Sequence, residues 1–234
     1  LVAMGLSLLV AMAAMGTIVW ARQGFFTTDA SADLRDSGRF ADAMLRRLIV
    51  QAGYLDDEYA MGQGVNALFN TGATPGEPNI KGFTNATFNQ PLVIGTTNTV
   101  PKSSAGYNGS DLLIIRFQGN RAYSNDPSST SSSSTIDQAV IDCLGTPAPH
   151  PANSNDMTPN ALYVANNASS GEPTLYCQRP DPIQGTWKTV IPLVDGVESF
   201  KVMYGVDKVA AGAAPSGITT SLTEQYLRAD QLIV

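Results

Sequence analysis

The first twenty residues form an uninterrupted apolar run, and this run constrains the fold more than any other feature. Residues 1–20 contain no charged side chain, and their only hydroxyl groups belong to Ser7 and Thr17. As an α-helix the run would be about 30 Å long, which matches the hydrocarbon thickness of a bilayer. The alternative is a secretory signal, but its apolar core would be shorter, would follow a basic segment and would end at a small-residue cleavage site. The run therefore predicts a membrane helix.

Small side chains recur along one face of this predicted helix. Ala3, Ser7 and Ala11 stand at i, i+4 and i+8, and small residues at this spacing allow another apolar helix to approach closely. These three residues are the candidate helix-packing site. Alanine, glycine and methionine are frequent throughout the run, so composition alone is the competing explanation of the spacing.

A second helical pattern follows directly after the apolar run. Charged residues cover much of its surface, with acidic residues leading and basic residues trailing, which suits the helix dipole. Gly24 is a predicted weak point, because glycine inside a helix costs about 1 kcal/mol relative to alanine, and Gly53 is a candidate C-cap. The apolar positions at helical spacing are Leu34, Ala41, Leu45, Leu48 and Ile49, with Phe40 and Met44 beside them. The sequence thus predicts a membrane helix over residues 1–23, continued by an amphipathic helix over residues 24–54.

From residue 55 onward the chain changes to short apolar segments separated by Gly, Pro and Asn. Residues 56–101 predict loops and short elements. Strands are predicted at residues 111–118, 135–143, 161–165, 174–178, 188–194 and 197–206. Since βαβ spacing is absent, we expect an antiparallel sheet with the preceding helix covering one face. The predicted fold class is α+β, a long N-terminal helix packed on an antiparallel β-sheet head domain of residues 55–234.

Charge and the scarcity of catalytic side chains argue against several classes of function. The net charge is −6 and there is no Lys/Arg run, so the chain offers no basic surface for nucleic acid. His150, the only histidine, lies between two prolines, and neither an HExxH motif nor a glycine-rich phosphate loop is present. The acidic cluster of residues 56–58 lacks the ligand spacing of a calcium loop. The sequence therefore predicts no catalytic site, no cofactor and no metal site.

Cys143 and Cys177 are the only cysteines in the chain. An even count is typical of exported, disulfide-bonded proteins, and both residues lie in or beside a predicted strand. We therefore predict that they are bonded, which would stabilise the fold by about 3 to 4 kcal/mol in the chain-entropy model. Two free buried thiols and a metal pair are the alternatives, although a metal would need further ligands that the sequence hardly supplies.

Two sets of residues match acceptors for sugars. A serine-rich tract, residues 128–135, predicts an exposed low-complexity loop, and O-glycosylation is the sharper interpretation. Three asparagines begin Asn-X-Ser/Thr sequences, a pattern that in a bacterial chain arises mostly by chance. The candidate glycosylation residues are Ser131, Ser132, Ser133, Asn85, Asn108 and Asn167.

Several separated segments together resemble the PilW-type minor pilins of type IV pilus assembly. LVAMGLSLLVAMAAMG is similar to the interior of a class III N-terminal methylation helix, and SGRFADAMLRRLIVQAGY, residues 37–54, is similar to the end of the family's helix. Further matches follow in order: GSDLLIIRF, DCLG, ALYVAN, LYC, PLVDGVESFKVMYGVD, the most specific, and YLRADQ. The chain departs from the family in lacking the cleavage glycine with its following glutamate and in stopping at Val234 before a closing strand. We therefore expect both ends to be incomplete.

The resemblance implies a structural subunit rather than an enzyme. Such a subunit is held in the bacterial inner membrane, processed by the prepilin peptidase, and polymerised by the pilus assembly machinery with other pilin subunits through its N-terminal helix. Its final location is an extracellular pilus. A minor subunit at a priming or tip position is the favoured form. A major filament subunit, a J-type minor pseudopilin of a periplasmic type II secretion pseudopilus, and a membrane-anchored adhesin or binding module are the alternatives.

Overall fold

The fold comes from a computed structural model of the whole chain. It describes residues 2–56, 59–60, 79–88, 105–120, 139–151, 156–180, 187–206, 223 and 225–232. By its internal contacts the chain divides into two compact units, Leu1–Ala43 and Met44–Val234. The first unit is helical throughout its described length, and the second contains the end of the same helix and all the described strands.

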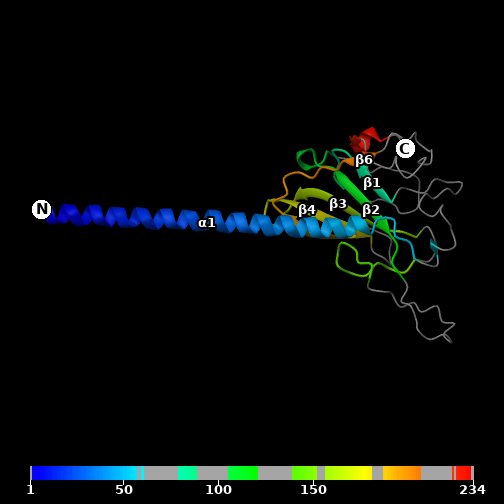
Figure 1. The fold of residues 1–234 in the computed structure, drawn as a ribbon, viewed down its shortest axis with the longest axis horizontal. Coiled ribbons are helices and arrows are strands. Elements are labelled where there is room, and N and C mark those ends of the chain that lie inside the picture. The colour runs from blue at the N-terminus through cyan, green and yellow to red at the C-terminus, as the bar shows by residue number, and fades with distance from the viewer. Residues whose placement is uncertain are drawn as a thin grey trace, which may run out of the picture. The chain divides into compact units, whose positions relative to one another are not determined.

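One continuous helix, α1 (Val2–Val50), contains both of the helical patterns predicted from the sequence (Figure 1). Gly24 does not interrupt it, and the hydroxyl groups of Thr27 and Thr28 both donate to the Gly24 carbonyl. After Val50 the chain turns at Gly53, which has a φ of +78° and whose N–H donates to the Arg116 carbonyl at 2.8 Å. Glycine adopts this left-handed conformation without the usual steric cost, which is why it ends the helical segment here.

Five strands form one antiparallel sheet in the order β1-β2-β3-β4-β5. Their bounds are β1 (Ile80–Phe83), β2 (Leu112–Phe117), β3 (Thr158–Asn166), β4 (Pro173–Pro180) and β5 (Trp187–Asp195). A separate two-stranded sheet pairs β6 (Tyr204–Val206) with β7 (Gln225–Leu227). Two short 3-10 helices are η2 (Tyr107–Gly109) and η3 (Ala229–Gln231). The predicted α+β architecture, a long N-terminal helix and an antiparallel sheet, is confirmed.

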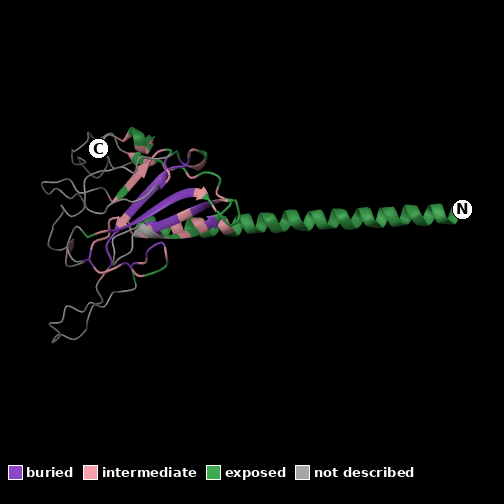
Figure 2. Cartoon of the chain, turned by 180° about the vertical axis from the view of Figure 1, so that it is seen from behind, coloured by how far each residue is buried: buried purple, intermediate pink, exposed green. Residues whose placement is uncertain are grey.

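Strand β2 is buried on both faces, which explains its continuous apolar sequence LLIIRF. Leu113, Ile115 and Phe117 point into one core cluster, while Leu112 and Ile114 point into another. The first cluster also contains both cysteines and Leu48, a residue of the last turns of α1 that has no exposed surface. The second cluster also contains Ala161 and Tyr163. Strands β2, β3 and β4 are accordingly the most buried part of the head (Figure 2).

The predicted strand over residues 135–143 is wrong in its described part. Ile141 makes only an isolated antiparallel bridge with Pro147. Between them the chain makes a tight turn, in which Gly145 has a φ of +77° and donates its N–H to the Asp142 carbonyl at 3.1 Å. The alternating apolar pattern indicated a strand, but the local turn takes the backbone bonds that a strand would use.

The predicted strand over residues 197–206 is shortened to β6. Before it, two backbone N–H groups are bound by side chains rather than by a strand: that of Phe200 by the Ser110 hydroxyl at 3.1 Å, and that of Val202 by the Asp111 carboxylate at 3.0 Å. The alternation still decides which side chains are buried, since Phe200 and Val202 are partly buried and Met203 is 60% exposed. Strand β1 lies within residues 56–101, for which the sequence predicts loops and short elements without locating a strand.

Candidate functional site

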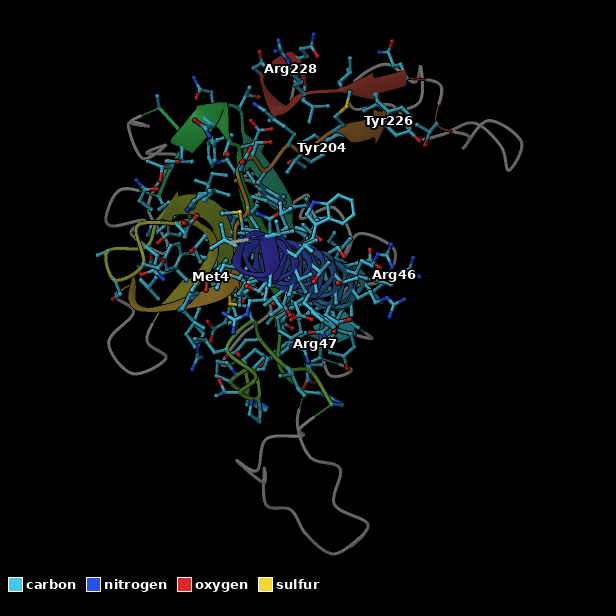
Figure 3. The ribbon with its side chains drawn as sticks, turned by 90° about the vertical axis from the view of Figure 1, so that its left-hand side faces the viewer. Met4, Arg46, Arg47, Tyr204, Tyr226 and Arg228 are labelled. Atoms are coloured by element: carbon cyan, nitrogen blue, oxygen red, sulfur yellow. A yellow bond between two sulfur atoms is a disulfide. The ribbon has the colours of Figure 1, made fainter. Side chains whose placement is uncertain are left out.

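The apolar half of α1, residues 2–23, is the candidate assembly site. Among the described residues, α1 is the one helix that is long and apolar enough to cross a membrane, by length and composition. Its large apolar side chains project from all sides of the helix and are exposed, as Figure 3 shows along the axis from Met4. Trp20 and then Arg22 end the apolar run, which is the residue order typical of a membrane–water boundary.

The hydroxyl groups inside this apolar run are bonded within the helix itself. Ser7 donates to the carbonyl of Met4 at 2.9 Å, and Thr17 donates to that of Ala14 at 2.8 Å. Neither hydroxyl therefore needs an external partner when water is removed from around it. Ala3, Ser7 and Ala11 are all exposed, and their role as a helix-packing ridge stays a prediction.

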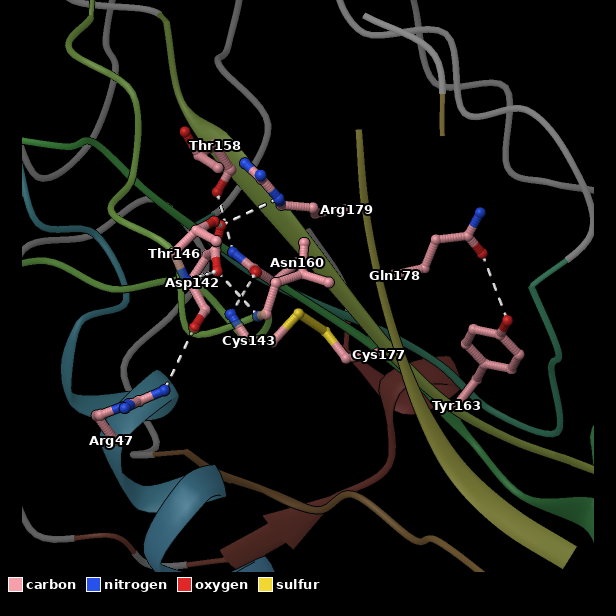
Figure 4. Close-up of a disulfide and its surroundings, with 11 residues drawn as sticks. Arg47, Asp142, Cys143, Thr146, Thr158, Asn160, Tyr163, Cys177, Gln178 and Arg179 are labelled. Atoms are coloured by element: carbon pink, nitrogen blue, oxygen red, sulfur yellow. Dashed lines mark hydrogen bonds and ion pairs between the residues drawn. A yellow bond between two sulfur atoms is a disulfide. The ribbon is translucent and has the colours of Figure 1, made fainter. Parts of the chain in front are cut away.

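In the head, a disulfide joins Cys143 to Cys177, as predicted from the sequence. Cys177 lies in β4, whereas Cys143 lies in the loop of residues 139–151, and the two Cα atoms are 6.3 Å apart. Both residues are buried in the core cluster that contains Leu48 (Figure 4). The loop is thus covalently attached to the sheet.

Asp142, next to the disulfide, has a fully buried carboxylate that organises the loop. Its Oδ1 accepts the N–H groups of Leu144 and Thr146, each at 2.9 Å, and its Oδ2 accepts the Thr146 hydroxyl at 2.7 Å. The same Oδ2 lies 3.0 Å from Nε of Arg179 on β4. Because Arg179 is two residues beyond Cys177, one strand holds the loop twice, by an ion pair and by the disulfide (Figure 4).

Two further hydrogen bonds attach the loop to other elements. Asn160 of β3 accepts the Cys143 N–H on its Oδ1 at 3.1 Å, and Arg47 in the last turn of α1 donates Nη2 to the Asp142 carbonyl at 3.3 Å. The loop therefore connects the end of α1, β3 and β4. We call the group Arg47, Asp142, Cys143, Asn160, Cys177 and Arg179 the loop clamp.

The chemistry of the loop clamp is that of a structural brace. Its ionised groups are already engaged with each other or with backbone atoms, and it contains no nucleophile beside a general base. Across the described ranges, no group of three or more His, Cys, Asp or Glu side chains is arranged to hold a metal ion. Sequence reasoning found the cysteines but missed Asp142, although the D-x-x-G spacing from Asp142 to Gly145 is a turn signal.

A second buried carboxylate, Asp111, holds the segment before β6 against the sheet. It accepts the N–H groups of Asn85 and Val202 at 2.9 and 3.0 Å, and Nζ of Lys201 lies 3.4 Å from it. Burial, and secondly the negative charge of Asp111, raise the pKa of Tyr204 to about 12. Tyr204 and Tyr226 belong to the paired strands β6 and β7, and both are labelled in Figure 3.

An aromatic row lies in the other core cluster. The rings of Phe88, Tyr163 and Tyr176 stack in sequence, with centroids 5.7 and 5.8 Å apart. The hydroxyl of Tyr163 donates to Oε1 of Gln178 at 3.4 Å. Burial, and secondly Tyr176, raise the pKa of Tyr163 to about 12. These tyrosines are core residues rather than a ligand platform.

The candidate glycosylation residues differ in their surroundings. Asn85 and Asn108 are exposed in the left-handed conformation, with φ of 50° and 48°. Asn108 donates Nδ2 to the Glu198 carbonyl at 3.2 Å, and Asn167 accepts the Ser169 N–H at 2.9 Å. The serines at 131, 132 and 133 lie outside the described residues. Glycosylation at these positions stays a prediction.

Comparison with known proteins bears on the C-terminal region. No curated protein and no solved structure matches the chain. Residues 161–234, which begin within β3, match the family model PilW, described as Type IV Pilus-assembly protein W. The resemblance predicted from the sequence is thus confirmed for this C-terminal region, which matches the PilW family of type IV pilus assembly.

Proposed function

We propose that the chain is a structural subunit of a type IV pilus or pilus-like filament and polymerises through the apolar half of α1. The observation that carries the proposal is an exposed apolar helix of membrane length in the same chain as a pilus-assembly match. So much exposed apolar surface is unstable in water and requires a bilayer or other apolar helices around it. A bilayer before assembly and a filament core after assembly would supply these two environments in turn.

We propose that three consecutive segments of the chain have different roles. Residues 1–23 are the transmembrane and filament-core helix, residues 24–54 are the amphipathic helix that covers the sheet, and residues 55–234 are the extracytoplasmic head. The disulfide supports an oxidising location for the head. The partners are other pilin subunits, the prepilin peptidase and the assembly machinery, and the locations are the inner membrane and then the pilus. The resemblance to PilW-type minor pilins favours a priming or tip position, and a subunit repeated along the fibre is the second form of the proposal.

An arginine in the apolar run tests the proposal. Ala11→Arg places a charge near the middle of residues 1–20, where insertion scales put its cost at about 2.5 to 3.5 kcal/mol. Filaments should lack the variant chain, as measured by immunoblotting of sheared pili, while its head keeps the disulfide and the thermal transition. The matched control is Ala30→Arg, the same change at an exposed position in the charged half of α1, which should enter filaments normally. Normal incorporation of Ala11→Arg would contradict the proposal.

A further inference from the structure

Charged side chains in the second half of α1 form two stripes of opposite sign. Asp29, Asp33 and Asp36 stand at i, i+4 and i+7 and therefore share one face, the acidic stripe. Arg35 and Arg39 stand at i and i+4 and share another face, the arginine stripe. At 3.6 residues per turn, the centres of the two stripes are about 110° apart around the helix axis. All five side chains are exposed.

The two stripes are poorly compensated within their own helix. Asp29 and Asp33 have no basic residue three or four positions away on either side, and Arg35 has no acidic residue at these distances. The charged neighbours of these three residues at that spacing are all of like charge, which destabilises a helix. Arg39 is the exception, with Asp36 before it and Asp42 after it.

Nothing else in the unit Leu1–Ala43 offsets these charges. None of the five side chains forms an ion pair with another described residue of that unit. A helix whose local charges conflict, without a partner inside its own unit, indicates a partner beyond that unit. The presence of both signs on one helix, on separate faces, favours a partner with the same pair of stripes.

We propose that the acidic stripe of one copy binds the arginine stripe of a second copy of this chain. The inference rests on the proposed filament function in its repeated form, in which copies of this chain are neighbours with parallel helices. Arginine forms charge-assisted, geometrically specific pairs with carboxylates, so the contact fixes orientation as well as adding affinity. The centre of the arginine stripe is about four residues, or about 6 Å, closer to the C-terminal end than the centre of the acidic stripe. Neighbouring copies are therefore staggered along the fibre.

The geometry of this contact also favours a fibre over a closed pair. The two stripes are different faces of the chain, so the interface is heterologous, and each copy offers one stripe to each of two neighbours. A heterologous interface that does not close into a ring continues as an open helical filament. Anionic lipid headgroups would meet the arginine stripe but would be repelled by the acidic stripe, which is why a second copy is the better fit.

Reversing each stripe separately tests the pairing. One variant, Asp29→Arg/Asp33→Arg, makes both faces basic, and another, Arg35→Glu/Arg39→Glu, makes both faces acidic. Full-length copies with two different tags are co-expressed in piliated cells, and the co-captured fraction is measured from sheared filaments. Either variant expressed alone should reduce co-capture about fivefold or more, because attraction is replaced by repulsion. Co-expression of the two variants with each other should restore it, because each basic face then meets an acidic one.

Thr27→Arg/Ala30→Arg is the control, since it adds two arginines at exposed positions of the same helix on a face away from both stripes, and it should leave co-capture unchanged. Normal co-capture of either variant alone overturns the inference. So does loss in both variants without recovery in the mixture, which would assign the stripes to a lipid or to a different subunit. Wild-type chains that enter filaments without capturing each other would also overturn it and leave the filament role intact. Absence of the wild-type chain from filaments would instead overturn the filament role itself.

Discussion

Replacing Asp142 by asparagine tests whether the loop clamp depends on the buried ion pair. The side chain of Asp142 has no exposed surface and that of Arg179 is 14% exposed, so little water reaches the pair. Asparagine keeps the shape and one acceptor oxygen, but it places an uncharged amide against the guanidinium. Removing one partner of a buried pair costs about 3 to 5 kcal/mol. Because Arg179 keeps some contact with water, we expect the free energy of unfolding to fall by about 3 kcal/mol, at the low end of that range.

The measurement is denaturant unfolding of the full chain in detergent micelles, in a Trp20→Phe background so that the fluorescence comes from Trp187 in the head. Asp230→Asn is the matched control, because Asp230 forms an ion pair of 3.3 Å with Arg228 in which both side chains are about half exposed. That variant should lose less than about 1 kcal/mol. In an Arg179→Met background, Asp142→Asn should cost about 2 kcal/mol less than in the wild type, which is the coupling between the two side chains. Equal losses at Asp142 and Asp230 would refute the account of the loop clamp.

Three further perturbations test other parts of the head. Replacing Cys143 and Cys177 together by alanine should lower the free energy of unfolding by about 4 kcal/mol, the value that the chain-entropy model gives for a sequence separation of 34. An unchanged free energy of unfolding, measured by denaturant unfolding, would contradict this prediction. Deleting residues 1–23 should leave a folded monomer by size-exclusion chromatography and circular dichroism, and an unfolded or obligately oligomeric product would show that the division between anchor and head is misplaced. The pKa values of Tyr163 and Tyr204, raised to about 12, predict that thermal stability falls as pH rises from 10 to 12, because the unfolded chain loses these protons first. A titration at 295 nm in which all eight tyrosines ionise together near pH 10 would contradict the last prediction.

The helix and the central strands could be predicted because their signals are local. An apolar run of twenty residues and a 3.6-residue periodicity predict α1, and the apolar run LLIIRF predicts β2. The disulfide followed from the residue count and the exported character of the chain, with no geometry required. In each case the deciding information lies within one segment or in a property of the whole sequence.

The misses occur where bonds between distant residues decide the structure. In TIDQAVIDC the alternation predicts a strand, but the Asp142 carboxylate binds the N–H groups two and four residues ahead and closes a turn. For residues 197–203 the partners are Ser110 and Asp111, which lie about ninety positions earlier in the chain. In this segment the alternating pattern correctly predicts which side chains are buried. The partners of its backbone N–H groups depend on tertiary structure, which the pattern does not contain.

Two features of α1 are unfavourable in an isolated chain: its exposed apolar run and its charged stripes. In the proposed filament these two features have complementary roles. Contact between apolar helices in a lipid-like core depends on close packing and has little hydrophobic preference for one axial position over another, because lipid tails are as apolar as the side chains. Charged stripes outside that core do discriminate, since a shift along the axis places like charges together. Thr28–Ala43 contains no apolar run to compete with this preference, and its charges are exposed. The apolar half of α1 would therefore hold a subunit in the fibre, while Asp29, Asp33, Asp36, Arg35 and Arg39 would set its position along the axis.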